Sequence, residues 1–149
     1  ANGVSPEELA TRTKNDKKES TMSSEFMSLS WVLALQLVMW VPYIINTIMV
    51  RGLVSAVGYP DNPPPIAPWA ERMKKAHSNS VENLVAFAAL VLMANAVGIT
   101  NDTTVMACEV YFWARLVHLG AYTFAVPWVR TLSFTAAWVC LVLLLLQLI

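Results

Sequence analysis

The chain has 149 residues, of which 56% are hydrophobic and 13% are charged. Soluble domains carry about 25% charged residues, so this composition excludes an ordinary soluble domain and favours a membrane protein. Ten basic residues balance ten acidic ones, which leaves no basic excess to attract nucleic acid. We therefore expect no nucleic-acid partner, and an integral, multi-pass protein in contact with the lipid bilayer.

The cysteines and histidines give little support for redox or metal chemistry. Cys108 and Cys140 lie in apolar runs without Cys-x-x-Cys spacing, so we expect buried, inert thiols. His77 and His118 lie on different segments, and no carboxylate stands at ligand spacing beside either. The sequence therefore predicts no metal site.

Residues 1–25 are polar and mixed in charge, and we interpret them as an N-terminal tail that is either solvated or docks onto a partner chain. Residues 26–149 predict one all-α membrane domain, a bundle of four transmembrane helices. A helix needs about 20 mainly apolar residues to cross a bilayer. The expected spans are 26–50, 70–97, 104–126 and 131–149.

The connections between these spans follow from proline and glycine. The proline-rich residues 52–68 predict a rigid loop, Gly98 closes the second helix, and 127–130 predict a tight turn. Four spans place both termini on one side of the membrane. Lysine and arginine are slightly more numerous on the other side, which the positive-inside rule makes cytoplasmic.

A charged stretch from Trp69 to Asn83 runs without a break into the second apolar helix. Helical spacing places Glu71, Lys75, Asn79 and Glu82 on one face of it. A carboxylate at the edge of a bilayer segment costs roughly 2–4 kcal/mol unless it is paired, so this face predicts a functional site. The alternative for its outermost charges is an interfacial helix start solvated by lipid headgroups.

The third helix carries one polar stripe, formed by Tyr111, Arg115, His118 and Tyr122 at offsets of four, three and four. Arg115 falls near the middle of the span. Because an unpaired arginine is costly at that depth, we expect Arg115 to face the bundle interior and to find an anion there.

Together these residues predict a pocket with a net positive charge. Arginines bind carboxylates, a glutamate takes an ammonium group, and a tyrosine adds a hydroxyl donor, so a small ligand with carboxylates and one ammonium would fit. A polar ligand beside open lipid suits chemistry between a water-soluble and a lipid-soluble substrate. The residues assigned to the pocket are Arg51, Lys75, Asn79, Glu82, Arg115, Tyr122 and Arg130.

Two motifs resemble the signature of the MAPEG superfamily, the membrane-associated proteins of eicosanoid and glutathione metabolism. The first is Glu71-Arg72-x-x-Lys75-Ala76-His77-x-Asn79-x-x-Glu82-Asn83. The second is Ala114-Arg115-x-x-His118-x-x-x-Tyr122, followed by Pro127-x-x-Arg130-x-x-x-Phe134. The resemblance covers roughly residues 26–149 in the right order.

This resemblance implies a homotrimer that binds glutathione between neighbouring subunits near the cytoplasmic face. It implies that glutathione is activated as a thiolate. The thiolate would then be transferred to lipophilic substrates or would reduce lipophilic peroxides. The implied glutathione contacts are Arg51, Lys75, Asn79, Glu82, Arg115 and Tyr122. By the same resemblance, Arg130 stabilises the thiolate. Lys75 and Ser78 depart from the arginines that other members carry at these positions.

Two alternatives remain open. The chain could be a structural subunit that keeps the fold without catalysis and joins a larger membrane complex through its N-terminal tail. It could also form a proton or ion pathway along Glu82, Arg115 and His118, although four spans are few for a transporter.

Overall fold

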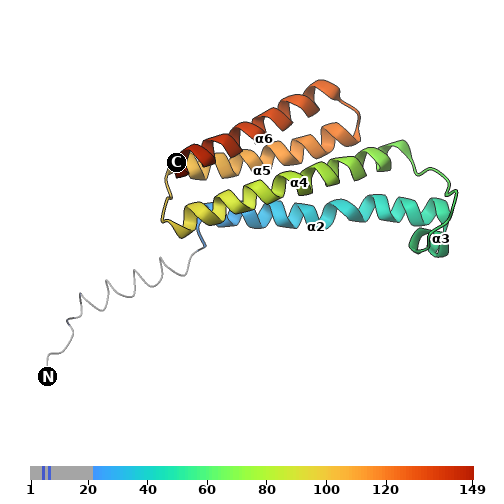
Figure 1. Ribbon diagram of the computed structural model, residues 1–149, viewed down its shortest axis with the longest axis horizontal. Coiled ribbons are helices and arrows are strands. Elements are labelled where there is room, and N and C mark those ends of the chain that lie inside the picture. The colour runs from blue at the N-terminus through green and yellow to red at the C-terminus, as the bar shows by residue number, and fades with distance from the viewer. Residues whose placement is uncertain (1–4, 6, 8–21) are drawn as a thin grey trace.

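A computed structural model describes residues 5, 7 and 22–149; most of the expected tail lies outside the described residues. The described part is helical and contains no strand. Its elements are α2 (Ser24–Arg51), α3 (Leu53–Val57), α4 (Pro68–Ala96), α5 (Asp102–Thr123) and α6 (Pro127–Leu148), shown in Figure 1.

The four long helices run alternately up and down and pack as one elongated bundle (Figure 1). The start of α2 and the end of α6 lie at one end, which we call the terminal end. There Glu25 accepts a hydrogen bond from Thr104 Oγ1 at 2.7 Å, and Asn101 Nδ2 donates to Gln147 at 2.9 Å. The start of α4 and the α5–α6 turn lie at the opposite end, which we call the loop end. The start and the end of the described bundle therefore lie together, as four alternating helices require.

Local capping chemistry sets where the helices begin. Ser23 caps α2, and its hydroxyl accepts from the Phe26 N–H at 3.3 Å. Asn101 caps α5 through a capping box in which its side chain accepts from the Thr104 N–H, while the Thr104 hydroxyl accepts from the Asn101 N–H. α4 and α6 each begin with a proline, which suits the first helical position because that N–H has no partner within the helix.

Two helices end with a residue in the left-handed conformation. After α4, Gly98 has φ 74°, and the Ile99 N–H bonds back to the Ala94 carbonyl at 2.8 Å. After α5 the same arrangement is formed by Ala125, with φ 60°, and the Val126 N–H bonds to the Ala121 carbonyl. Glycine adopts this conformation freely, whereas alanine does so at a cost.

The structure moves several expected boundaries. Residues 127–130 were expected as a tight turn but form the first turn of α6, because Pro127 supplies the fixed φ of a helix start. Residues 52–68 were expected as a loop without helix, yet Leu53–Val57 forms α3 after Gly52 interrupts the chain at φ 76°. Glu25, expected in the solvated tail, is buried in the first turn of α2.

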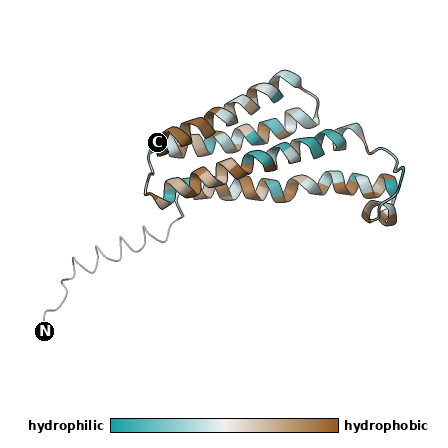
Figure 2. Ribbon diagram, viewed as in Figure 1, coloured by the Kyte–Doolittle hydropathy of each residue, from teal (hydrophilic) through white to brown (hydrophobic). Residues whose placement is uncertain are grey.

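The apolar core occupies the half of the bundle nearer the terminal end. Its largest members include Phe87 and Tyr111, whose rings stack with centroids 3.9 Å apart, and both cysteines are buried there as free thiols. Figure 2 shows the corresponding change along α4, which is hydrophilic over its first half and hydrophobic toward Ala96. The half nearer the loop end is therefore where polar side chains enter the bundle.

Three of the described helices are long and apolar enough to cross a membrane, namely α2, α4 and α6. α5 does not meet that measure, and its 22 residues include Asp102, Glu109 and Arg115. The outer surface is rich in large apolar side chains: Leu37 is 72% exposed and Val85 is 70% exposed. A soluble monomer rarely leaves so much contiguous apolar surface in water, so lipid covers much of this bundle.

Candidate functional site

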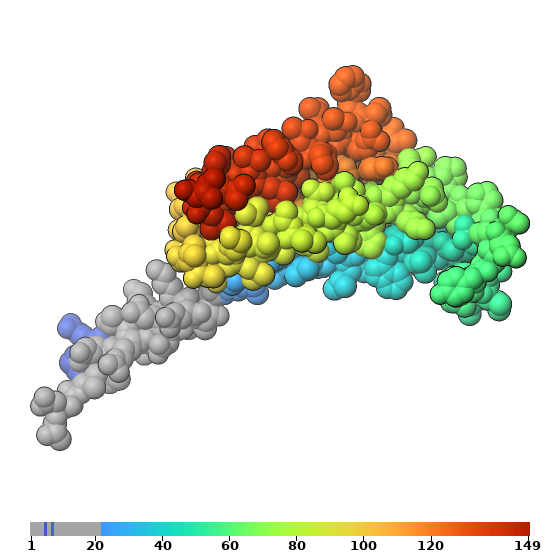
Figure 3. All heavy atoms as spheres, viewed as in Figure 1, coloured from blue at the N-terminus to red at the C-terminus, as the bar shows by residue number. Residues whose placement is uncertain are grey.

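A hollow of about 340 Å³ lies between α4, α5 and α6 in the half nearer the loop end. All of its walls are polar or aromatic side chains. They are Asn79 from α4, His118 and Tyr122 from α5, and Arg130, Thr131 and Phe134 from α6. Figure 3 shows α4 and α6 side by side on one face of the molecule, the two helices that flank this hollow.

Arg130 brings the cationic charge to this hollow. Its guanidinium carbon lies 5.2 Å from the centroid of the Tyr122 ring, within the range of a cation–π interaction. Arg130 is exposed and lies in the first turn of α6, where the helix dipole adds positive potential. The position is therefore well suited to attract an anion from outside the protomer.

His118 forms the aromatic back of the hollow. Its ring meets the Tyr122 ring edge-on, with centroids 5.6 Å apart, and lies 6.1 Å from the Phe134 ring. His118 is only 3% exposed, so its position is set by this packing. The two neighbours hold the imidazole between α5 and α6.

Arg115 lies in the bundle interior, as its place on the polar stripe predicted, and is 2% exposed. Its Nη2 donates to the Asn79 side-chain oxygen at 3.1 Å. Nε and Nη1 are buried and have no hydrogen-bond partner among the described residues. The anion that we expected beside Arg115 is therefore replaced by an amide oxygen, and the guanidinium keeps unused donors next to the hollow.

Polar pairs between α2 and α4 fix the helix that carries Asn79. Gln36 Nε2 donates to Ser80 Oγ at 2.6 Å, and the Tyr43 hydroxyl lies 2.9 Å from His77 Nδ1. Such hydrogen bonds within a membrane bundle contribute about 0.6–2 kcal/mol each. They hold the first half of α4 against α2, so that Asn79 faces α5.

A smaller hollow of about 180 Å³ adjoins the first toward the loop end and shares Tyr122 and Arg130 with it. Arg72 lines it from α4, and its Nε donates to the Thr123 carbonyl at 2.8 Å. This bond satisfies a carbonyl at the end of α5 and ties the α5–α6 turn to α4. Arg130 thus lies between two hollows, with Arg72 as the second cation nearby.

Within the single chain the structure brings together four of the seven predicted site residues. Asn79, Tyr122 and Arg130 line the first hollow, and Arg115 bonds to Asn79. The other three, Arg51, Lys75 and Glu82, do not line it.

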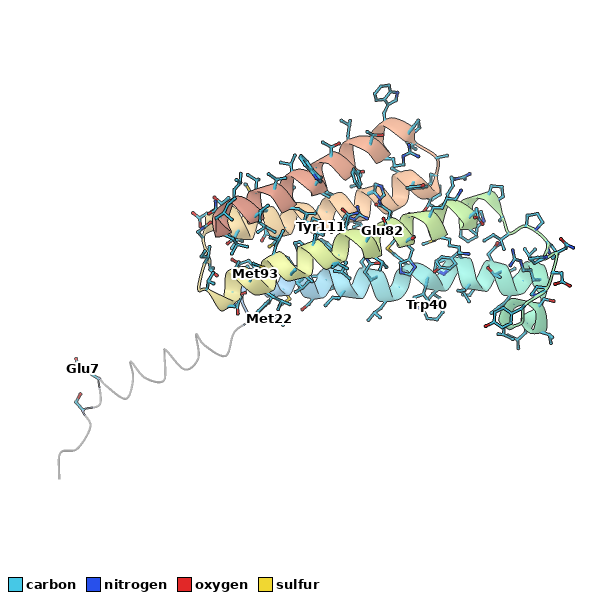
Figure 4. All side chains as sticks on the ribbon, viewed as in Figure 1. Glu7, Met22, Trp40, Glu82, Met93 and Tyr111 are labelled. Carbon is cyan, nitrogen blue, oxygen red and sulfur yellow. The ribbon has the colours of Figure 1, made fainter. Side chains whose placement is uncertain are left out.

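These three residues lie elsewhere on the protomer surface. The Arg51 Nε donates to the Pro64 carbonyl at 2.8 Å and so fastens the loop before α4. Lys75 and Glu82 are exposed on α4, and Figure 4 shows Glu82 about halfway along that helix. In a single protomer, therefore, the only carboxylate of the predicted pocket lies outside the hollow.

Three further residues line the hollow but were not assigned to the site from sequence. His118 was on the polar stripe, and its periodicity with Tyr122 could have assigned it. Thr131 and Phe134 lie in the expected span 131–149, but the expected turn at 127–130 separates Arg130 from that helix. With Pro127 as the first residue of α6, helical spacing places Arg130, Thr131 and Phe134 on one face.

The donor set suits an anionic ligand. Arginine, asparagine, tyrosine and histidine offer N–H and O–H groups, and the described walls of the hollow contain no carboxylate to compete for them. The unused donors of Arg115 add a buried positive charge behind Asn79. A volume of about 340 Å³ lies within the range of small-ligand sites.

The long apolar helices and the lipid-facing surface define an integral, multi-pass membrane protein, with a cationic hollow in the half of its bundle nearer the loop end. The sequence profile of the MAPEG family matches residues 28–149, and the chain belongs to the MAPEG family. This confirms the resemblance that the two motifs carried. The family includes glutathione-related transferases as well as other members. Comparison with curated proteins gives no match to this chain.

Proposed function

We propose that this protein is a glutathione-dependent membrane transferase or peroxidase acting on lipophilic electrophiles. The observation that carries the proposal is the hollow in which Asn79, Tyr122 and Arg130 meet, backed by the unused donors of Arg115. Glutathione has two carboxylates, one ammonium group and a thiol, which match a site rich in cationic donors. Family membership favours the same ligand.

In this proposal Arg130 is the catalytic residue. A free thiol with a pKa of about 8.5 is only a few per cent thiolate at neutral pH. A guanidinium beside the sulfur favours the charged form and lowers the thiol pKa by about one to three units. Exposure of Arg130 at the rim of the hollow would bring the thiolate close to lipophilic substrates that arrive from the bilayer.

We further propose a homotrimer in which α5 also spans the membrane, as the fourth helix of each protomer. Arg51, Lys75 and Glu82 lie on the surface of the single protomer, where a neighbouring subunit can combine them with its own hollow. Glu82 would then supply the carboxylate that an ammonium group needs. α5 carries its charged Arg115 inward, so its lipid-facing side stays apolar at that depth.

Replacing Arg130 tests this function. Arg130→Ala should abolish thiolate formation and conjugation of a lipophilic electrophile, while the oligomeric mass stays that of the unchanged protein. Arg130→Lys keeps the charge without the planar fork, so it should restore part of the thiolate. Lys74→Ala, an exposed cation on α4 outside the hollow, serves as the matched control. Full turnover by Arg130→Ala would refute the assignment.

The second candidate is a non-catalytic subunit of a larger membrane complex. The hydrogen bond from Arg51 to the Pro64 carbonyl favours this candidate, because it gives an arginine that was predicted to bind ligand a structural role instead. Deleting residues 1–21, which leaves the Ser23 cap and the buried Glu25 in place, should then release a co-purifying partner. Purification of the unchanged chain with no partner bound, together with turnover, would exclude this candidate.

A further inference from the structure

A second, larger hollow of about 680 Å³ lies on another part of the protein, between α2 and α5 in the half nearer the terminal end. Figure 4 places Met22, one of its lining residues, at the start of α2, at the far end from the α5–α6 turn. The candidate glutathione site is formed by α4, α5 and α6 near the loop end, so the two hollows share no residue.

The walls of this hollow are two matched helical stripes. On α2 the spacing of three and four residues gives one face with two hydroxyls and two large apolar side chains: Ser24, Met27, Ser28 and Trp31. On α5 the same spacing gives one face with a carboxylate and two aromatic rings: Glu109, Phe112 and Trp113. The Phe112 and Trp113 rings meet edge-on at 5.3 Å, and the two tryptophans are 58% and 62% exposed.

Glu109 is the unusual member of this group. It is exposed on the outer side of α5 and lies seven residues after Asp102, or about 10 Å along the helix. It makes no ion pair within residues 22–149, whereas a carboxylate at this depth is costly without a cation. Tryptophan faces attract quaternary ammonium groups, so this carboxylate lies in an environment that favours such a cation.

An apolar groove lies beside the hollow, on the other side of Trp113, between α5 and α6. It has a volume of about 440 Å³, and Trp113 lines both the hollow and the groove. Small side chains, Ala114, Ser133 and Ala136, line it together with the larger Val117 and Leu132. It runs from Val110, on the side of the terminal end, toward Val129 in the first turn of α6, on the side of the loop end.

We propose that the hollow and the groove together bind one membrane phospholipid with a quaternary-ammonium headgroup, its ammonium at Glu109 and its acyl chain along the α5–α6 groove. The polar part of the site lies nearer the membrane edge and the apolar part deeper, which is the order of groups in a phospholipid. A soluble amine would use Glu109 but would leave the groove empty. The proposal does not depend on glutathione chemistry.

Lipid binding to protein purified in a neutral detergent tests the proposal, with native mass spectrometry to count bound molecules. The probes are phosphatidylcholine and phosphatidylglycerol with identical acyl chains. We expect the unchanged protein to prefer phosphatidylcholine by about fivefold to tenfold, the effect of a desolvated cation–π contact and a charge pair. Tetramethylammonium should displace the lipid only at far higher concentration, because it cannot fill the groove.

Variants separate the two parts of the site. Glu109→Gln should lose the headgroup preference, and Glu109→Lys should reverse it in favour of phosphatidylglycerol. Ala136→Phe, which fills the groove, should weaken both lipids equally. Glu71→Gln, an exposed carboxylate at the loop end, is the matched control and should bind as the unchanged protein does.

Two results would overturn the proposal. The first is equal binding of the two lipids by the unchanged protein, or a preference that survives both Glu109 substitutions. The second is a change in the mass of the protein assembly on Glu109→Lys without any change in lipid selectivity, which would show that a second copy of the chain covers this face.

Discussion

Arg115 shows most clearly how one residue links the membrane to function. An arginine inside a membrane bundle is costly, and among the residues that the structure describes only one of its nitrogens has a partner, the Asn79 oxygen. A residue retained purely for stability would have its donors satisfied. Buried donors without a partner beside a hollow are instead typical of a group that binds a ligand.

Replacing Arg115 by methionine therefore separates stability from binding. Because methionine is apolar and of similar length, Arg115→Met should leave the free energy of unfolding unchanged or raise it by about 1–4 kcal/mol. Glutathione affinity should fall about tenfold to hundredfold, since a charge-assisted hydrogen bond is lost. Thermal unfolding in detergent and calorimetry measure the two effects. A large loss of stability with unchanged affinity would make Arg115 a structural residue.

The sequence predicted the burial of Arg115 well, because the helical period and the cost of a charged group in the membrane both favour an inward position. Arg115 was expected to face the bundle interior, and it is buried together with Tyr111 and His118 of the same stripe, whereas Tyr122 is half-buried. The position of Arg130 was predicted less well, because its segment was interpreted as a turn although Pro127 favours a helix start. The positions of Lys75 and Glu82 relative to a neighbouring subunit depend on how chains assemble, and the helical periodicity of one sequence does not predict contacts between chains.

The elements of the bundle are held in register by their ends. Arg72 ties the end of α5 to α4, and Glu25 ties the start of α2 to α5. The strained position is Ala125, which holds the left-handed conformation between α5 and the first turn of α6. That turn carries Arg130, so the conformation of Ala125 fixes where the cation lies.

A matched pair of substitutions tests this strain. Ala125→Gly should stabilise the protein by up to about 1 kcal/mol, because glycine removes a left-handed cost of about 1–3 kcal/mol and adds an entropic cost of its own. Gly98→Ala should destabilise by a similar amount, because φ is 74° there and no atom lies within 4 Å of the added Cβ, so the backbone alone is strained. Chemical denaturation in detergent measures both. Destabilisation by Ala125→Gly would show that the turn is not strained.

The element boundaries that the sequence missed share a physical cause. Apolar periodicity located the four long helices, but it does not report caps, and caps decide the last residues of a helix. The four starts are set by residue types with a known preference for that position, namely Ser23, Pro68, Asn101 and Pro127. α3 is too short for periodicity to find.

At the scale of the whole molecule, a single chain brings together only part of the predicted site. Asn79, Arg115, Tyr122 and Arg130 meet within one chain. Arg51 is the last residue of α2, and its side chain bonds to the loop before α4. Its bond to Pro64 uses one of the five N–H groups of the guanidinium. A trimer with sites between subunits would let Arg51 of one protomer serve the hollow of its neighbour.

Complementation between inactive variants tests that arrangement. Arg51→Ala and Arg130→Ala should each lack activity alone. Co-expressed in equal amounts, they should form mixed trimers. About a quarter of all sites in the population should then have both arginines intact, and activity should return in proportion. If mixed trimers form and remain inactive, both arginines act within the same protomer or Arg51 has no part in the site.

The most direct test of the proposed function is glutathione binding by the purified protein, measured by calorimetry together with ultraviolet absorbance of the thiolate on the same sample. We predict saturable binding with thiolate formation at neutral pH, where free glutathione is almost entirely thiol. The absence of binding at millimolar glutathione would contradict the proposal and favour the structural subunit. Binding without thiolate would show a site that holds glutathione but lacks the chemistry assigned to Arg130.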